Sequence, residues 1–237
     1  MSKIELTPAF LIHRRTFKNN SLLLDFFTRD YGKIRLVGRG IRAAKTNIQM
    51  FQKLSISFSG RGKLQTLTHW ETDDLPRVLS GETLILSIYV NELIERLLPE
   101  NDVYLALFEA YQRLICQIAT LEAESKLWLL RLFENNLLAQ IGYGLDFARD
   151  VEQMPIEENE SYEYLQQSGF RKNISGKISG ILLNKMSLNG LENMPDLSQL
   201  KICRNLNRQR LEQLLGDKPL QSRSLIFTPI NKNEQLK

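Results

Sequence analysis

The sequence predicts an α+β protein of two domains, an N-terminal OB-fold β-barrel over residues 1–79 and a mainly α-helical domain over residues 80–237. Short apolar or alternating segments, separated by turn residues, fill the first 70 positions. From Ser80 onward the apolar residues recur at the three- and four-residue steps of amphipathic helices. The formal charge changes sign near the same boundary.

Five strands are expected in the N-terminal domain. They cover about residues 9–13, 21–28, 33–37, 54–58 and 64–67, with turns at 30–32 and 60–63. Five short strands joined mostly by hairpins fit a small closed or partly open barrel such as the OB-fold, with a small β-sandwich as the alternative. Alternation over 33–37 buries one face and places Lys33 and Arg35 together on the other.

Three helices are expected next, over about residues 82–98, 102–119 and 123–140. Ser80 is placed to cap the first, and Gly142 and Gly144 end the third. Their short connections favour an antiparallel bundle. Residues 145–180 are expected to form loops with at most a short hairpin. A last helix over about 197–215 is basic and carries Lys201, Arg204, Arg208 and Arg210.

Charge is unevenly distributed along the chain. Residues 1–63 hold 13 Lys and Arg against 3 Asp and Glu, residues 64–163 hold 6 against 19, and residues 164–237 hold 12 against 5. A basic segment followed by an acidic one suggests two bodies with different partners. Because the basic residues interleave with strands, the pattern favours a barrel that binds nucleic acid.

The candidate nucleic-acid contacts are cations spread over the strands and loops of the barrel. They are Arg14, Arg15, Lys18, Arg29, Lys33, Arg35, Arg39, Arg42 and Lys45. Such side chains can follow a phosphate backbone and release its counterions, which makes the affinity depend on salt but implies no sequence specificity. Phe17 and Tyr31, in loops between these cations, are candidates for stacking on unpaired bases.

No pattern of a catalytic or metal centre stands out. His13 and His69 have no cysteine or second histidine at ligand spacing, and Gly60-Arg61-Gly62-Lys63 lacks the spacing and the hydroxyl residue of a phosphate-binding loop. Carboxylates such as Glu92 and Glu95 fall at spacings typical of a solvated helix face. The sequence therefore predicts a binding protein without a cofactor, and not an enzyme.

Features of the whole chain favour a cytosolic protein. Cys116 and Cys203 lie far apart in helical segments, and no disulfide is expected between them. No run approaches the roughly 18 apolar residues that a membrane span requires, and the start of the sequence lacks the layout of a signal peptide.

Several short segments share an order and spacing along most of the chain. They are AFLIHRR at 9–15, LDFFT at 24–28, GKIRLVGRG at 32–40, YVNEL at 89–93, FE at 133–134, IGYG at 141–144 and GDKPLQSR at 216–223. Together they resemble the bacterial recombination mediator family RecO.

The resemblance implies an N-terminal OB-fold, a helical C-terminal domain and a DNA repair role at the nucleoid. That role comprises binding of single- and double-stranded DNA, strand annealing and, with the partner RecR, help in loading the RecA recombinase. It also implies that the acidic, apolar C-terminal tail of the single-stranded DNA-binding protein docks on the helical domain.

Arg131 is the candidate for pairing with the terminal carboxylate of that tail, because it lies one step from the apolar stripe of the expected third helix. Leu130, Leu137 and Leu138 would offer apolar surface to the tail. Core packing is the competing interpretation for these leucines.

The sequence departs from the family pattern at one place. Many RecO-like proteins carry a four-cysteine zinc site just after the Gly-Tyr-Gly segment. Residues 147–155 contain no cysteine, so no zinc is expected and packing must hold this loop.

Two other functions are compatible with the residues alone. An RNA-binding OB-fold protein of translation or RNA processing would prefer RNA to single-stranded DNA. A nuclease or transferase with a carboxylate site would show metal-dependent turnover. The oligomeric state, the stoichiometry with RecR and any DNA contact of the basic last helix are left open.

Overall fold

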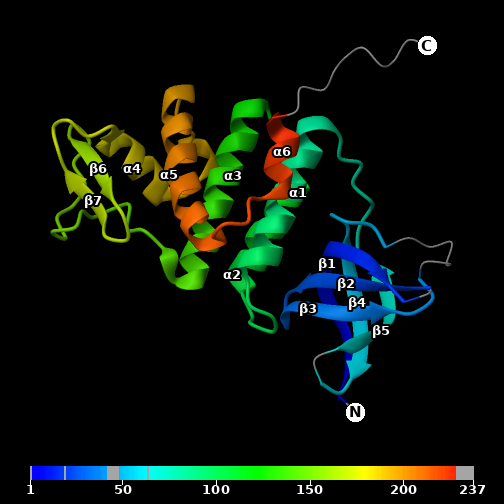
Figure 1. The fold of residues 1–237 in the computed structure, drawn as a ribbon. Helices are drawn as coiled ribbons and strands as arrows, with labels where there is room; N and C mark the ends of the chain where they lie inside the picture. Colours follow the sequence, from blue (N-terminus) through cyan, green and yellow to red (C-terminus); the bar gives the residue numbers. More distant parts are fainter. Residues whose placement is uncertain (1, 19, 42–47, 63, 228–237) are drawn as a thin grey trace, which may run out of the picture. The chain divides into compact units, whose positions relative to one another are not determined.

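The structure, a computed structural model, describes residues 2–18, 20–41, 48–62 and 64–227 (Figure 1). Contacts divide these residues into two compact units. The first combines the residues up to Phe108 with those from Asp217 onward, and the second runs from Glu109 to Gly216. The first unit therefore holds the predicted barrel together with segments from both ends of the helical region 80–237.

The first unit contains a closed barrel with the strand order β1-β2-β3-β5-β4. Its strands are β1 (Ser2–Phe17), β2 (Ser21–Thr28), β3 (Gly32–Gly38), β4 (Lys53–Gly60) and β5 (Gln65–Thr72). Neighbouring strands are antiparallel except for the short parallel pair β3 and β5. The predicted five-stranded, OB-like barrel is confirmed. The β-sandwich alternative is excluded because the sheet closes on itself.

Alternation along the strands separates an inner from an outer barrel face. Inner residues such as Leu11 and Phe26 form the barrel core. Phe10 and Phe27 point outward but are equally buried, because their rings lie 5.6 and 5.5 Å from the ring of Phe108, measured between centroids. Part of the outer face of β1 and β2 is therefore covered.

Two helices pack against each other in the first unit. They are α1 (Gly81–Leu97) and α6 (Gln221–Phe227). Asn91 of α1 donates a hydrogen bond of 3.1 Å to the Ile12 carbonyl oxygen of β1. Glu92 accepts hydrogen bonds from the backbone N–H groups of Gln221 and Ser222. Glu92 therefore caps α6, which corrects the expectation of a solvated carboxylate.

The second unit is mainly helical and carries a small sheet. Helix α2 (Leu105–Gln117) enters this unit at Glu109. The other helices are α3 (Ala123–Leu138), α4 (Gly180–Leu188) and α5 (Leu197–Leu215), with a π-helical turn at Ala139–Tyr143 and a 3-10 turn at Leu191–Asn193. Strands β6 (Ser161–Leu165), β7 (Gly169–Lys172) and β8 (Ile178–Ser179) form a sheet in the order β7-β6-β8.

The helices expected at 102–119, 123–140 and 197–215 are confirmed to within a few residues. The strand β8 and the helix α4 were not expected, because two residues and nine residues are too short to show a clear period. None of the described helices is long and apolar enough to cross a membrane.

Trp128 of α3 is the largest fully buried side chain of the second unit. It packs in a core with Phe170 and Leu182, and its Nε1 donates a hydrogen bond of 2.9 Å to the Gly190 carbonyl oxygen. This bond ties α3 to the turn after α4, which forms one wall of the pocket beside α3.

The loop between the π-helical turn and β6 is held by hydrogen bonds as well as by packing. Asp146 and Asp150 each accept two backbone N–H bonds through Oδ1. The ring of Phe147 lies 5.6 Å from that of Phe170. In the described part of the chain, no group of His, Cys, Asp or Glu side chains is arranged to hold a metal ion.

Candidate nucleic-acid and partner interfaces

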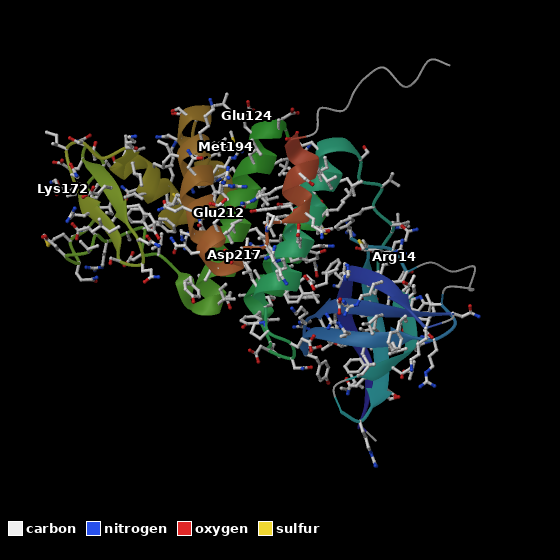
Figure 2. All side chains as sticks on the ribbon, in the orientation of Figure 1. Arg14, Glu124, Lys172, Met194, Glu212 and Asp217 are labelled. Carbon is white, nitrogen blue, oxygen red and sulfur yellow. The ribbon has the colours of Figure 1, made fainter. Side chains whose placement is uncertain are left out.

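A cluster of exposed cations lies at one end of the barrel. We call Arg14, Arg15, Lys18 and Arg39 the basic end. Leu22 of β2 pairs with Thr16 of β1 on one side and with Gly38 of β3 on the other, so the end of β1 and the end of β3 are neighbours. No acidic residue occurs between Arg14 and Leu22 in the sequence. Figure 2 shows Arg14 at the barrel surface.

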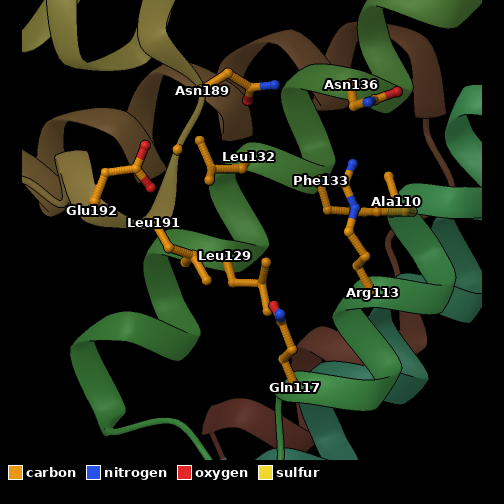
Figure 3. Close-up of a pocket in the computed structure, with 11 residues that line it drawn as sticks. Ala110, Arg113, Gln117, Leu129, Leu132, Phe133, Asn136, Asn189, Leu191 and Glu192 are labelled. Carbon is orange, nitrogen blue, oxygen red and sulfur yellow. The ribbon is translucent and has the colours of Figure 1, made fainter.

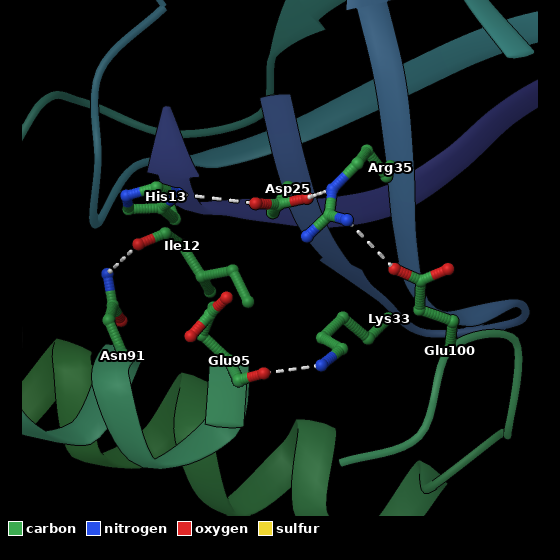
Figure 4. Close-up of polar contacts among 8 residues, drawn as sticks. All are labelled: Ile12, His13, Asp25, Lys33, Arg35, Asn91, Glu95 and Glu100. Carbon is green, nitrogen blue, oxygen red and sulfur yellow. Dashed lines mark hydrogen bonds and ion pairs between the residues drawn. The ribbon is translucent and has the colours of Figure 1, made fainter. Parts of the chain in front are cut away.

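Lys33 and Arg35 share the outer face of β3, as predicted, but this face is not open to solvent (Figure 4). Lys33 is 8% exposed, and its Nζ donates to the backbone carbonyl oxygen of Glu95 in α1. Desolvation lowers the pKa of Lys33. Arg35 donates to Asp25 and pairs with Glu100 at 3.3 Å. Lys33 therefore does not project into solvent as expected, because α1 covers it, whereas Arg35 keeps 27% of its side chain exposed but is paired with Asp25 and Glu100.

Asp25 is a buried carboxylate between His13 and Arg35. His13 Nδ1 lies 3.2 Å from one of its oxygens, and Arg35 donates to the other. Burial by itself would raise the pKa of Asp25, but hydrogen bonds from His13 and Arg35 bring the pKa below its usual value. The hydrogen bond to Asp25 raises the pKa of His13. His13 is therefore the partner of a buried carboxylate.

The remaining candidates lie away from the basic end or outside the described residues. Arg29 is exposed at the opposite end of β2. Arg42 and Lys45 lie outside the described residues. Tyr31 is exposed in the turn beside Arg29, whereas Phe17 is half-buried in the basic end with a lysine ammonium 5.5 Å from its ring centroid. Of the two stacking candidates, only Phe17 lies beside the clustered cations.

Arg131 and the three leucines predicted beside it lie inside the second unit. Arg131 is 7% exposed and pairs at 2.9 Å with Glu134, one turn later in α3. Leu130, Leu137 and Leu138 have almost no exposed surface. The prediction that these four residues form a docking surface is wrong, because a buried carboxylate neutralises Arg131 and the leucines fill the core.

A buried polar network surrounds the Arg131–Glu134 pair. Glu134 also accepts a hydrogen bond of 3.0 Å from Asn207 of α5. Arg210, counted among the basic residues of the last helix, is buried and donates to Asn135, Asn207 and a backbone carbonyl oxygen. Burial lowers the pKa of Arg210 to about 10. The exposed cations of α5 are Lys201, Arg204 and Arg208.

A pocket of about 250 Å³ lies between α2, α3 and the turn after α4 (Figure 3). Leu129, Leu132, Phe133 and Leu191 supply its apolar lining. Arg113 of α2 is exposed at its rim, and no described acidic residue pairs with it. We call this site the Arg113 pocket.

The Arg113 pocket can hold an apolar side chain next to an anionic group. Sequence reasoning missed it. The only signal in the sequence was Arg113 itself, a cation within an acidic stretch. Helical periodicity places this residue on a solvated face, but it does not show which neighbouring residues form a cavity.

Two protein-family descriptions cover nearly the whole chain. Recombination protein O N terminal matches residues 1–75, and Recombination protein O C terminal matches residues 79–223. The chain belongs to the RecO family. The RecO N-terminal match covers the barrel strands, and the RecO C-terminal match begins before α1 and ends within α6.

Similar proteins named DNA repair protein RecO extend over almost the same length. The protein of Coxiella burnetii strain CbuG_Q212 is 37% identical over 232 residues, which covers 95% of this chain and 99% of the relative. That of Nitrosococcus oceani is 36% identical over 231 residues, covering 94% and 93%. That of Serratia proteamaculans is 34% identical over 236 residues, covering 94% of each. The similarity therefore includes both RecO regions.

Proposed function

We propose that the protein is a non-enzymatic recombination mediator of DNA repair that acts in the cytoplasm at the nucleoid. It binds single- and double-stranded DNA, anneals complementary strands and, with RecR, helps to load RecA onto DNA coated by the single-stranded DNA-binding protein. The observation that carries the proposal is the basic end of an OB-like barrel in a RecO family chain. Annealing makes and breaks no covalent bond, so neutralising and aligning two strands requires no catalytic residue.

The basic end defines where phosphates would bind. Its four cations lie on neighbouring strand ends, where they can contact successive phosphates of one strand. Because α1 covers the face that carries Lys33 and Arg35, the nucleic-acid path crosses the β1–β2 turn and not the middle of β3. Phe17, half-buried at the end of β1 beside this turn, is available for contact with a base.

The Arg113 pocket is the proposed docking site for the tail of the single-stranded DNA-binding protein. Arg113 offers a guanidinium to the terminal carboxylate, and the leucine and phenylalanine side chains of α3 accept the apolar residues of the tail. This assignment replaces Arg131, whose charge is already paired in the interior.

Charge reversal of Arg14, Arg15 and Lys18 to glutamate tests the DNA surface. The affinity for a single-stranded oligonucleotide at low salt is expected to fall by roughly tenfold or more, and the slope of log K against log salt to flatten by about 2, because three phosphate contacts are lost. Fluorescence anisotropy over a series of salt concentrations measures both quantities.

Reversal of the exposed cations Arg149, Arg171 and Lys172 is the matched control, because it changes the net charge equally on the other unit. Equal losses in the two triple variants would contradict the assigned surface. Preference for RNA in a competition assay would favour the RNA-binding alternative, and cleavage of labelled DNA with Mg²⁺ or Mn²⁺ would favour a nuclease. Strand annealing with and without the single-stranded DNA-binding protein tests the mediator role.

A further inference from the structure

His13 lies between the part of β1 that α1 contacts and the basic end. On one side, Asn91 of α1 binds the carbonyl oxygen of Ile12. On the other side, Arg15 of the basic end follows two residues later in β1. Because alternate residues of a strand share a face, His13, Arg15 and Phe17 form one row on the outer face of β1. The His13 side chain is 46% exposed, so a ligand at the basic end can reach it.

The two ring nitrogens of His13 have different surroundings. Nδ1 lies 3.2 Å from Oδ2 of Asp25, and Figure 4 shows Asp25 between the His13 ring and the Arg35 guanidinium. An ionised carboxylate can only accept hydrogen bonds, so Nδ1 carries a proton. Nε2 has no hydrogen-bond partner among the described residues. In the neutral ring Nε2 is then an acceptor, and only protonation turns it into a donor.

Several charged groups face the ring from neighbouring elements. They are Asp25 of β2, Lys33 and Arg35 of β3, Glu95 of α1, Glu100 after α1 and Arg15 of β1 itself. Apart from Arg15, these groups comprise three carboxylates and two cations, so a neutral His13 leaves one negative charge unbalanced beside the basic end. Protonation of His13 balances that charge. DNA phosphates are therefore repelled less from this part of the barrel when His13 is charged.

The surroundings favour the charged ring. The hydrogen bond to Asp25 raises the pKa of His13 above its ordinary value of 6.5, although desolvation and Arg15 act in the opposite direction. At a given pH, the ring is therefore charged more often than that of an unperturbed histidine.

We propose that protonated His13 donates from Nε2 to a DNA phosphate beside Arg15, so that the affinity for single-stranded DNA rises as pH falls. The contact rests on the proposed DNA binding at the basic end and adds one residue to it. Asp25 is a positioning residue, because it fixes the ring and reserves Nε2 for the phosphate.

DNA binding would then be coupled to the uptake of a proton. A phosphate next to the ring favours the imidazolium, so the pKa of His13 is higher in the complex than in the free protein. Between these two values the complex holds more protons than its separate components, and affinity falls as pH rises. Below both values the ring is charged in either state, and its contribution to affinity is constant.

A pH series of DNA binding tests the contact in the full-length protein. Fluorescence anisotropy of an oligothymidylate at low salt is measured near pH 6 and near pH 8.5, since the phosphodiester does not titrate in this range. The unmodified protein is expected to bind roughly three to ten times more tightly near pH 6, because one phosphate contact is gained. His13→Gln should bind weakly at both pH values, and His13→Lys, which keeps a cation, should bind tightly at both.

His69→Gln is the matched control. His69 is exposed on β5 and is the only other histidine of the chain, so this variant should keep the pH dependence of the unmodified protein. A purely structural role of His13 would weaken the glutamine and lysine variants alike. If His13→Gln keeps the pH dependence, the contact is overturned.

Calorimetry on the unmodified protein gives a readout that does not depend on the folding of a variant. Binding enthalpies in two buffers of different ionisation enthalpy give the number of protons taken up, which is expected to reach about 0.3 to 0.5 at its maximum between pH 6 and 8.5. No proton uptake across this range would overturn the contact. If charge reversal of Arg14, Arg15 and Lys18 leaves DNA affinity unchanged, the basic end itself fails. If that reversal weakens binding while the unmodified protein takes up no proton, only the His13 contact fails.

Discussion

At the scale of single residues, Asn91 and Glu92 have roles that helical periodicity does not reveal. Asn91 Nδ2 binds the carbonyl oxygen of Ile12, which joins α1 to the barrel. The Glu92 carboxylate accepts two backbone N–H bonds and the Ser222 hydroxyl bond at the start of α6. An anionic side chain at a helix N-terminus also interacts favourably with the helix dipole. These contacts explain the structural roles of the asparagine and the glutamate in the YVNEL segment and of Ser222 at the start of α6.

His13→Gln is expected to show the pH dependence of the His13–Asp25 pair. The pKa of His13 is raised in the folded protein, so its stabilising charge is fully present below the unfolded value of about 6.5 and is lost as pH rises through the folded value. Asp25 stays ionised in this window because its pKa is lowered. The unmodified protein should exceed the variant in free energy of unfolding by about 0.5 to 1 kcal/mol near pH 5.5, and by less at pH 8.5. Urea unfolding at several pH values measures the difference, and a constant difference would contradict the assignment.

At the scale of elements, different faces of α3 lie in three different environments. Trp128 enters the apolar core, and Glu134 joins the buried network with α5. Leu129 and Asn136 line the Arg113 pocket. From Trp128 to Leu138 every residue of α3 is buried except Asn136, which is partly buried, so the polar residues of this stretch do not mark a solvated side. This is why a charge next to an apolar stripe was a poor guide to the surface.

Glu134→Leu is expected to destabilise the protein by about 3 to 5 kcal/mol, because it leaves Arg131 buried without its carboxylate. The double variant Arg131→Met with Glu134→Leu should recover much of this loss, since it removes both charges. Urea unfolding followed by circular dichroism gives the free energies of a double-mutant cycle. A loss below about 1 kcal/mol for Glu134→Leu would indicate that solvent reaches the pair.

At the scale of the whole molecule, the compact unit that contains the barrel includes more than the five strands. Phe108 and α1 cover outer-face residues of β1, β2 and β3, and the segment from Asp217 returns to pack on α1. The compact unit that carries the basic end is therefore larger than residues 1–79.

A fragment of residues 1–79 should not be a stable monomer in isolation. It would expose Phe10 and Phe27, which have no exposed surface in the full chain, together with Lys33. We expect self-association and binding of a hydrophobic dye that the full-length protein lacks. Size-exclusion chromatography and dye fluorescence of the two proteins measure this. A monomeric fragment with cooperative unfolding would show that the cover by α1 is dispensable.

Much of the architecture follows from local pattern. The alternation in 33–37 and 54–58 was sufficient for strands, and the stripe in 123–140 for a helix, because these patterns depend only on neighbours in the sequence. The clustering of Arg14, Arg15 and Lys18 also followed, since they are close in the chain and near one turn. The Arg113 pocket did not follow, because the turn after α4 that closes it lies more than 50 residues from the α2 and α3 residues of its lining.

The sequence by itself determined the barrel, the helical region and a basic surface at the first hairpin, because side-chain periodicity and local charge need no distant partner. Only the tertiary structure decided which cations remain exposed. Lys33 donates to Glu95, 62 residues away, and Glu134 accepts from Asn207, 73 residues away. Alternation assigns a residue to a face, but only packing shows what covers that face. The free energy of a charged group depends on that cover and on the partners it brings.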